Sequence, residues 1–146
     1  FIGDVDELWD PNLVVSRFVF SAGELYKINL KVYAYWLNNR SSEEFLGTLV
    51  GKWGQIKEEC LNHLRSNTKR AVEGGWHFTS MGNLQKKLDD QYTEESYNTS
   101  EIRAKIQENI KNNQDFLGRD FTFQIDESEW PNYLTNNRKR FKHLLK

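Results

Sequence analysis

The chain has 146 residues, of which 38% are hydrophobic, 28% charged and 14% aromatic, and its formal net charge is −1. This composition is typical of a globular domain with a real core and excludes a disordered chain. The small net charge favours neither a nucleic-acid nor a membrane partner, and no run approaches the roughly 20 apolar residues that span a bilayer. A single cysteine, Cys60, excludes an internal disulfide and a multi-cysteine metal cluster, and it favours a reducing compartment.

The first element is an apolar stub that runs into acidic residues, in the stretch FIGDVDELWDPN. Phe1 and Ile2 look like the end of a buried parallel strand, so we expect the earlier part of that strand to precede residue 1 in a longer protein. Pro11 fits the first turn of a short helix that reaches about Arg17, with Asp10 as its N-cap.

Strand signals dominate the next part of the chain. Alternating β-branched and aromatic residues predict strands at 17–20 and within 25–37. Residues 38–44 are predicted as a turn with a possible helix start, and 45–55 as strand and loop because glycines are mixed with apolar residues. Apolar residues at helical spacing then predict a helix over 56–65.

The second half of the chain predicts three helices and one strand. The first two helices carry apolar residues at helical spacing, and Thr99 or Ser100 caps the second of them. Pro131 opens the last helix, which is apolar through Leu145. The predicted ranges are 84–92 and 97–113 for the first two helices, 120–126 for the strand, and from 131 onward for the last helix. We therefore expect a mixed α/β fold in one domain, residues 1–146, without an internal linker.

Three carboxylates, Asp4, Asp6 and Glu7, follow the apolar stub directly. Carboxylates gathered after a buried strand are costly unless a positive group neutralises them, and a divalent cation such as Mg²⁺ or Mn²⁺ does this with oxygen ligands. A solvated loop is the alternative. An EF-hand is excluded, because Leu8 stands at its third ligand position and Trp9 at its required glycine.

The same acidic pair also suits a phosphatase of the haloacid-dehalogenase type. Asp4 would then be the nucleophile and Asp6 the general acid. That class expects Thr or Val two residues after the second aspartate, where Leu8 stands, so it is kept as the second hypothesis.

The stretch Gly74-Gly75-Trp76-His77-Phe78 combines glycines with a histidine between two aromatic residues. Glycines let a backbone approach a ligand closely, and the large neighbours would preset the ring of His77. A lone histidine is more often a satisfied core residue. If the acidic cluster binds a metal, His77 is its natural nitrogen ligand.

Further charged side chains provide candidates for a base and for anion binding. Asp89, Asp90, Glu94 and Glu95 form either a solvated helix face or the source of a general base. Arg119 suits a diphosphate, although an ion pair with Asp120 or another carboxylate is an equal alternative. A basic C-terminal segment is either the wet face of a helix or a nonenzymatic binding surface for phosphate backbones. It consists of Arg138, Lys139, Arg140, Lys142, His143 and Lys146.

Several segments, in this order, resemble glycosyltransferase family 17, which includes the β-1,4-mannosyl-glycoprotein N-acetylglucosaminyltransferases. They are GDVDELWDP, KVYAYWLN, GGWHFTSMG, FLGRD and IDESEWPNYLTNN. The resemblance spans nearly the whole chain, and its most specific pair is D-V-D-E with G-W-H-F. It implies a GT-A-like, Rossmann-related fold, of which this chain would be the C-terminal part without the first strands.

The resemblance also implies an inverting transfer from UDP-GlcNAc to a glycan or glycoprotein acceptor, with no nucleic-acid partner. Asp6 would hold Mn²⁺ or Mg²⁺, Asp4 would contact the ribose or the metal, and His77 would be the third metal or diphosphate contact. Trp76 and Phe78 would wall the sugar pocket. The base would be Glu95, with Glu7 as its rival.

This chain departs from the family pattern at three places. Thr79-Ser80 stands where Ser-Tyr is usual, Trp9-Asp10 where Ile-Pro often follows D-V-D-E, and no histidine lies near Thr93. These departures bear on the acceptor more than on the metal and the donor.

Overall fold

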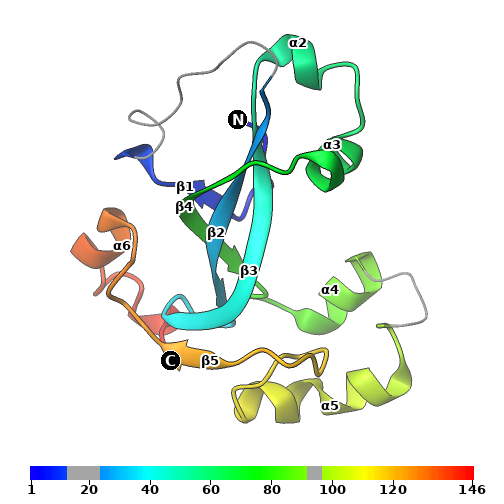
Figure 1. Cartoon of the computed structure of the whole chain (residues 1–146). Helices are drawn as coiled ribbons and strands as arrows, with labels where there is room; N and C mark the ends of the chain where they lie inside the picture. The colour runs from blue at the N-terminus through cyan, green and yellow to red at the C-terminus, as the bar shows by residue number, and fades with distance from the viewer. Residues whose placement is uncertain (13–23, 92–96) are drawn as a thin grey trace. The chain divides into compact units, whose positions relative to one another are not determined.

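A computed structural model describes residues 1–12, 24–91 and 97–146 (Figure 1). Its contacts divide the chain into two compact units, although the sequence predicts one domain. Unit 1 comprises Phe1–Val32 and Glu44–Phe78, and unit 2 comprises Tyr33–Glu43 and Thr79–Lys146. The strand predicted at 17–20, the end of the helix predicted to reach Arg17, and Glu95 lie outside the described residues.

Five strands form one sheet in the order β1-β4-β2-β3-β5. The pairs β1–β4 and β3–β5 are antiparallel. Backbone bonds from Lys27 N to Arg70 O (2.8 Å) and from Tyr35 N to Thr79 O (3.4 Å) show that β2 and β4 run parallel. The mixed α/β class is therefore confirmed. The strands are β1 (Glu7–Trp9), β2 (Tyr26–Ala34), β3 (Asn39–Val50), β4 (Ala71–Thr79) and β5 (Phe123–Ile125).

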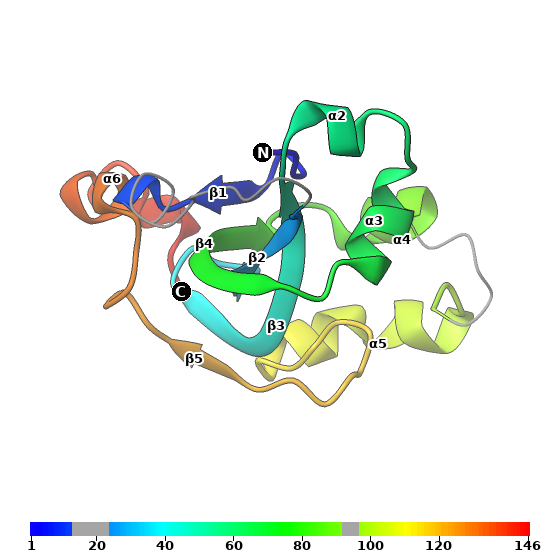
Figure 2. The same cartoon turned by 45° about the horizontal axis from the view of Figure 1, so that its top comes forward.

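The N-terminal segment closes the strands of unit 1 into a ring of backbone pairing (Figure 2). Ile2 and Leu49 of β3 exchange two backbone hydrogen bonds, of 2.9 and 2.8 Å, and β1 pairs with β4. The expectation of a buried parallel strand at Phe1-Ile2 is wrong, because Ile2 makes one isolated antiparallel bridge and Phe1 is exposed.

Two short helices and an apolar core complete unit 1. They are α2 (Trp53–Ile56) and α3 (Leu61–Asn67), so the helix predicted over 56–65 is broken. The break occurs because Cys60 is extended (φ −66°, ψ 128°), although the apolar period continues through it. The buried core residues are Ile28, Leu30 and Val50 in one cluster and Leu49, Ile56 and Leu64 in another.

The turn predicted over residues 38–44 is also wrong, because β3 begins at Asn39. This polar start of the strand is held by β5, with Ser41 opposite Phe123 and Asn39 opposite Ile125. The strand follows from pairing with a segment more than eighty residues away rather than from local β propensity.

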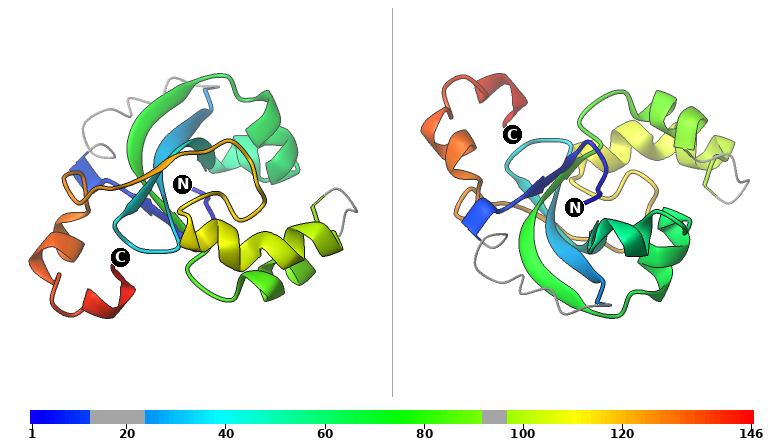
Figure 3. Two further views of the ribbon diagram at one scale, coloured as in Figure 1. Left: turned by 90° about the horizontal axis from the view of Figure 1, so that it is seen from below. Right: turned by 90° about the horizontal axis from the view of Figure 1, so that it is seen from above.

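Unit 2 is built around two helices that lie side by side, α4 (Leu84–Gln91) and α5 (Ser100–Lys111) (Figure 3). Both helices are confirmed, and so is the Thr99 cap, whose side chain accepts from Ile102 N at 3.3 Å. Their core contains Leu84, Leu88, Ile106, Phe116 and Leu117.

The predicted last helix is divided in two. It consists of α6 (Asn132–Asn136) and a 3-10 helix, η1 (Lys142–Leu144). Among the described residues, no helix has the length and hydropathy to cross a bilayer.

Candidate functional site

The D-V-D-E motif is a tight turn that leads directly into a strand. Glu7 N donates to Asp4 O at 3.1 Å, which closes the turn and leaves Val5 exposed at its tip. β1 then starts at Glu7. The carboxylates therefore stand at the start of a strand, rather than at the end of one as the sequence suggested.

The register between β1 and β4 brings the second motif to the first. Glu7 lies opposite His77, and Trp9 lies opposite Gly75. One step beyond the ladder, Phe78 N donates to Asp6 O at 3.0 Å. Gly75 has φ +144°, and a Cβ there would overlap the carbonyl of Leu8. The glycine of the G-W-H motif is thus what lets β1 approach β4.

Asp6 and His77 meet although they are 71 residues apart in the sequence. The distance from Asp6 Oδ2 to His77 Nε2 is 3.2 Å. The Asp6 side chain is 37% exposed, whereas that of His77 is 11% exposed. The ring of Phe45 stacks at a tilt on the imidazole, with centroids 4.0 Å apart. This arrangement presents one carboxylate and one imidazole nitrogen together at the edge of unit 1's buried interior.

Asp4 takes a different direction. Its Oδ2 lies 3.5 Å from Arg65 Nη1, and its side chain is 60% exposed. Within residues 1–12, 24–91 and 97–146, no three His, Cys, Asp or Glu side chains form a group that could hold a metal ion. The predicted set of Asp4, Asp6 and His77 is therefore present as a pair, with Asp4 beside it.

Glu7 points inward and is buried, with 6% of its surface exposed. The Thr48 hydroxyl donates to Glu7 Oε2, and Trp9 Nε1 donates to Thr48 Oγ1 at 2.8 Å. A side chain at Gly47 would overlap the Glu7 carboxylate. Burial raises the pKa of Glu7, against the lowering effect of the Thr48 hydrogen bond.

Glu7 Oε1 and His77 Nδ1 belong to the buried polar atoms that have no hydrogen-bond partner among the residues that the structure describes. Buried polar atoms are nearly always paired, so unpaired ones mark a place where internal contacts do not complete the structure. Both atoms belong to residues that the sequence motifs already single out.

The aromatic neighbours of His77 lie on the other face of β4. Successive side chains of a strand point to opposite faces, so Trp76 and Phe78 alternate with His77. Both are partly exposed. Their predicted part in a sugar pocket stays a prediction.

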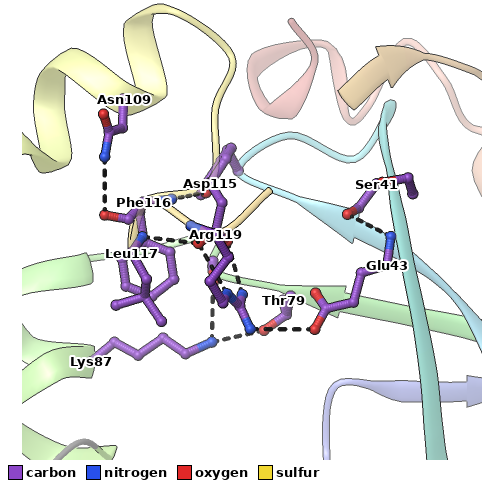
Figure 4. A network of polar contacts seen from close by, with 12 residues as sticks. Ser41, Glu43, Thr79, Lys87, Asn109, Asp115, Phe116, Leu117 and Arg119 are labelled. Atoms are coloured by element: carbon purple, nitrogen blue, oxygen red, sulfur yellow. Dashed lines mark hydrogen bonds and ion pairs between the residues drawn. The ribbon is translucent and has the colours of Figure 1, made fainter. Parts of the chain in front are cut away.

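Arg119 belongs to unit 2, where carboxylates hold it (Figure 4). Its Nε lies 3.0 Å from Asp115 Oδ2 and its Nη2 2.8 Å from Asp115 Oδ1, while Nη1 is 3.5 Å from Glu43 Oε1. Its ion-pair partners are thus Asp115 and Glu43. Asp115 is buried, and because residues 115–119 form a loop rather than a helix, the i, i+4 spacing to Arg119 alone did not predict this pair.

Two of the other charged candidates, Asp89 and Arg138, are held in ion pairs. Asp89 pairs with Arg103, and Arg138 donates to Glu127 Oε2 at 2.7 Å. The Arg138 pair lowers the pKa of Glu127. No local sequence pattern predicted Thr48 as part of the site. It lies beside Glu7 because the N-terminal segment pairs with β3.

Asp6 Oδ2 and His77 Nε2 lie within hydrogen-bonding distance of each other, 3.2 Å, and a carboxylate oxygen with an imidazole nitrogen is also a ligand pair that a divalent cation accepts. The imidazole nitrogen favours a transition metal, hence Mn²⁺ over Mg²⁺. A comparison of the chain with protein-family models, characterised proteins and solved structures gave no match.

Proposed function

We propose that this chain carries the donor-binding centre of a metal-dependent, inverting glycosyltransferase that uses a UDP-sugar, as its resemblance to family 17 implies. The single observation that carries the proposal is the meeting of Asp6 and His77, 3.2 Å apart, from the two most specific motifs of that resemblance. The GT-A-like, Rossmann-related fold is part of the proposal, and the parallel pair β2–β4 within a mixed sheet is compatible with it.

Asp6 and His77 would hold the cation, Mn²⁺ or Mg²⁺, through Oδ2 and Nε2. When bound, a divalent cation supplies positive charge to a leaving diphosphate. For Nε2 to act as a ligand, His77 must carry its proton on Nδ1. The stacked ring of Phe45 and the strand pairing hold the imidazole in one orientation, which the site requires.

In the transfer, the acceptor hydroxyl oxygen bonds to the anomeric carbon as the bond from that carbon to the diphosphate oxygen breaks. UDP leaves with the electron pair, and a carboxylate takes the hydroxyl proton. We assign the base to Glu95. Glu7 is the less suitable rival, because its carboxylate is buried and engaged by Thr48, so we assign it to supporting the turn that carries Asp6.

Three assignments follow from the resemblance and remain proposals. Asp4 would contact the ribose of UDP-GlcNAc, since its carboxylate is exposed beside Arg65. Trp76 would contact the sugar, and Arg119 the diphosphate. The acceptor would be a glycan or a glycoprotein.

The proposal is tested by titrating Mn²⁺ together with UDP into the chain, followed by the electron paramagnetic resonance of free Mn²⁺. We expect Asp6→Asn and His77→Gln each to weaken Mn²⁺ binding at least tenfold, because each removes one of two protein ligands. The matched controls are Asp10→Asn, whose amide oxygen can still accept from Asn12 N, and His63→Gln at an exposed position of α3. Equal binding by wild type and both site variants would refute the metal assignment.

The two earlier alternatives give different results in the same preparation. A phosphatase that uses Asp4 and Asp6 would release phosphate from a phosphomonoester and lose this activity in Asp4→Asn. A nonenzymatic nucleic-acid binder would show salt-dependent binding that weakens when Arg138, Lys139 and Arg140 are neutralised together. Either outcome without UDP-sugar binding would replace the proposed function.

A further inference from the structure

The carboxyl ends of the two parallel strands in unit 2 carry unusual backbone. Tyr35 directly follows β2 with φ 70°, and Ser80 directly follows β4 with φ 57°. Non-glycine residues rarely adopt positive φ, and such residues gather at ligand sites. The carboxyl ends of parallel strands are also a common place for ligands in α/β sheets, so this edge of unit 2 is a candidate ligand site.

The loop of residues 115–119 holds the Arg119 guanidinium at this edge. The buried Asp115 carboxylate accepts hydrogen bonds from Leu117 N (3.1 Å) and Arg119 N (3.2 Å) and holds the Arg119 guanidinium in a fork. The Tyr35 hydroxyl accepts from Phe116 N at 2.7 Å. The loop therefore fixes the direction of the guanidinium before any ligand arrives.

Lys87, on helix α4, provides the second positively charged group. Lys87 Nζ donates to Thr79 Oγ1 at 2.8 Å and to Ser80 Oγ at 3.0 Å. The neighbouring Lys86 is exposed, whereas Lys87 is partly buried. Figure 4 shows the ends of Lys87, Thr79, Arg119 and Glu43 turned toward one another.

We propose that Lys87, Arg119 and the hydroxyls of Thr79 and Ser80 form a binding site for a phosphoryl group. A phosphoryl group has three acceptor oxygens and suits donors that converge from several directions, which a guanidinium, an ammonium and two hydroxyls provide. Glu43, 3.5 Å from Arg119 Nη1, occupies the side from which an anion would enter and competes with it. The inference goes beyond the diphosphate contact that the proposed function gives to Arg119, because Lys87 and the two hydroxyls are assigned from the geometry of unit 2 alone.

The test is a calorimetric titration of inorganic pyrophosphate into the whole chain, with a chelator present to exclude metal-mediated binding. We expect saturable binding with one site. Lys87→Gln should weaken it at least tenfold, because a charge-assisted contact is lost. The matched control is Lys86→Gln, which removes the same charge from the next residue of the same helix and should bind as wild type does.

A second variant predicts a gain instead of a loss. Glu43→Gln removes the competing carboxylate while keeping its shape, so pyrophosphate should bind several-fold more tightly. A purely structural role for the cluster predicts no gain. If Lys87→Gln fails to fold, shifts of backbone amide resonances in the unmodified chain report the site, with the largest changes expected at Ser80 and Arg119. No saturable binding below about 10 mM, or shifts confined to other residues, would overturn the inference.

The source of the phosphoryl group is distinguished by competition. UDP, added with the chelator still present, should displace pyrophosphate if the natural ligand is the diphosphate of a nucleotide-sugar donor. If UDP does not displace it, the ligand is a separate phosphorylated molecule. Equal binding of pyrophosphate by wild type and by Lys87→Gln overturns the site under either source.

Discussion

The two clusters of charged side chains in this protein are held in opposite ways. In unit 1, backbone pairing between β1 and β4 positions Asp6 and His77, and the buried atoms Glu7 Oε1 and His77 Nδ1 are left without partners in the described part of the chain. In unit 2, side-chain ion pairs position Arg119, and the Asp115 carboxylate is fully engaged. The cluster in unit 1 therefore keeps polar capacity for a ligand, whereas charge in unit 2 also holds the fold together. Substitutions should separate these two roles.

The largest loss of stability is expected from Asp115→Ala. It leaves the Arg119 guanidinium without its main partner and two loop amides without an acceptor, at a cost of about 4 kcal/mol in the free energy of unfolding. Urea denaturation measures this cost. Asp120→Ala, at an exposed position in the same loop, is the control and should change stability little. Equal effects of the two variants would remove the contrast between the units.

Gly75→Ala should be the next most damaging change. Its Cβ would overlap the carbonyl of Leu8, and its φ of +144° is unfavourable for alanine, so we expect a loss of about 3 kcal/mol. The separation of β1 from β4 should also weaken Mn²⁺ binding. Gly82→Ala is the matched control, because no atom of the described residues lies within 4 Å of the position its Cβ would take. Unchanged amide protection in β1 would contradict the pairing of Trp9 with Gly75.

Glu7→Gln should change the pH dependence of stability in unit 1. Burial raises the pKa of Glu7 above its ordinary value of 4.5, so the charged form is disfavoured in the folded state. The folded protein binds a proton at Glu7 more tightly than the unfolded chain does. This adds to the free energy of unfolding fully below about pH 4.5, and the addition is lost as pH rises through the folded-state pKa. The neutral variant should therefore gain stability relative to wild type between about pH 4 and pH 7. Thermal unfolding at both pH values measures this, and a constant difference would contradict it.

The smallest effect on stability is expected from Asp6→Asn. The Asp6 side chain is 37% exposed, although that of His77 is only 11% exposed, and asparagine keeps an oxygen that can accept from His77 Nε2, so the cost should stay within about 1 kcal/mol. The same variant is expected to lose Mn²⁺ binding. Chemical denaturation and metal titration of one preparation test both. A loss of several kcal/mol would show that the pair is structural.

Local patterns in the sequence predict the elements whose stability is local. Helices α4 and α5 follow from apolar residues at helical spacing and from the Thr99 cap, and β2 follows from alternation. The meeting of Asp6 and His77 was expected as well, because a carboxylate cluster and an isolated histidine are complementary in chemistry.

The remaining features depend on distant partners that no local pattern contains. β1 has only three residues and exists because β4 lies beside it, and the polar start of β3 exists because β5 does. Thr48 reaches Glu7 only through the bridge between Ile2 and Leu49. The partners of Arg119 likewise depend on the fold, which brings Glu43 to the loop of Asp115.

The double attachment of the N-terminal segment has a thermodynamic consequence. Ile2 is bonded to Leu49 on one side of the turn, and Asp6 is bonded to Phe78 on the other. Only Gly3, Asp4 and Val5 lie between these fixed points. Ordering a backbone residue costs about 1–2 kcal/mol in conformational entropy, and for this turn that cost is met during folding. A ligand of Asp6 would find the turn already ordered, so more of its contact energy would remain as affinity.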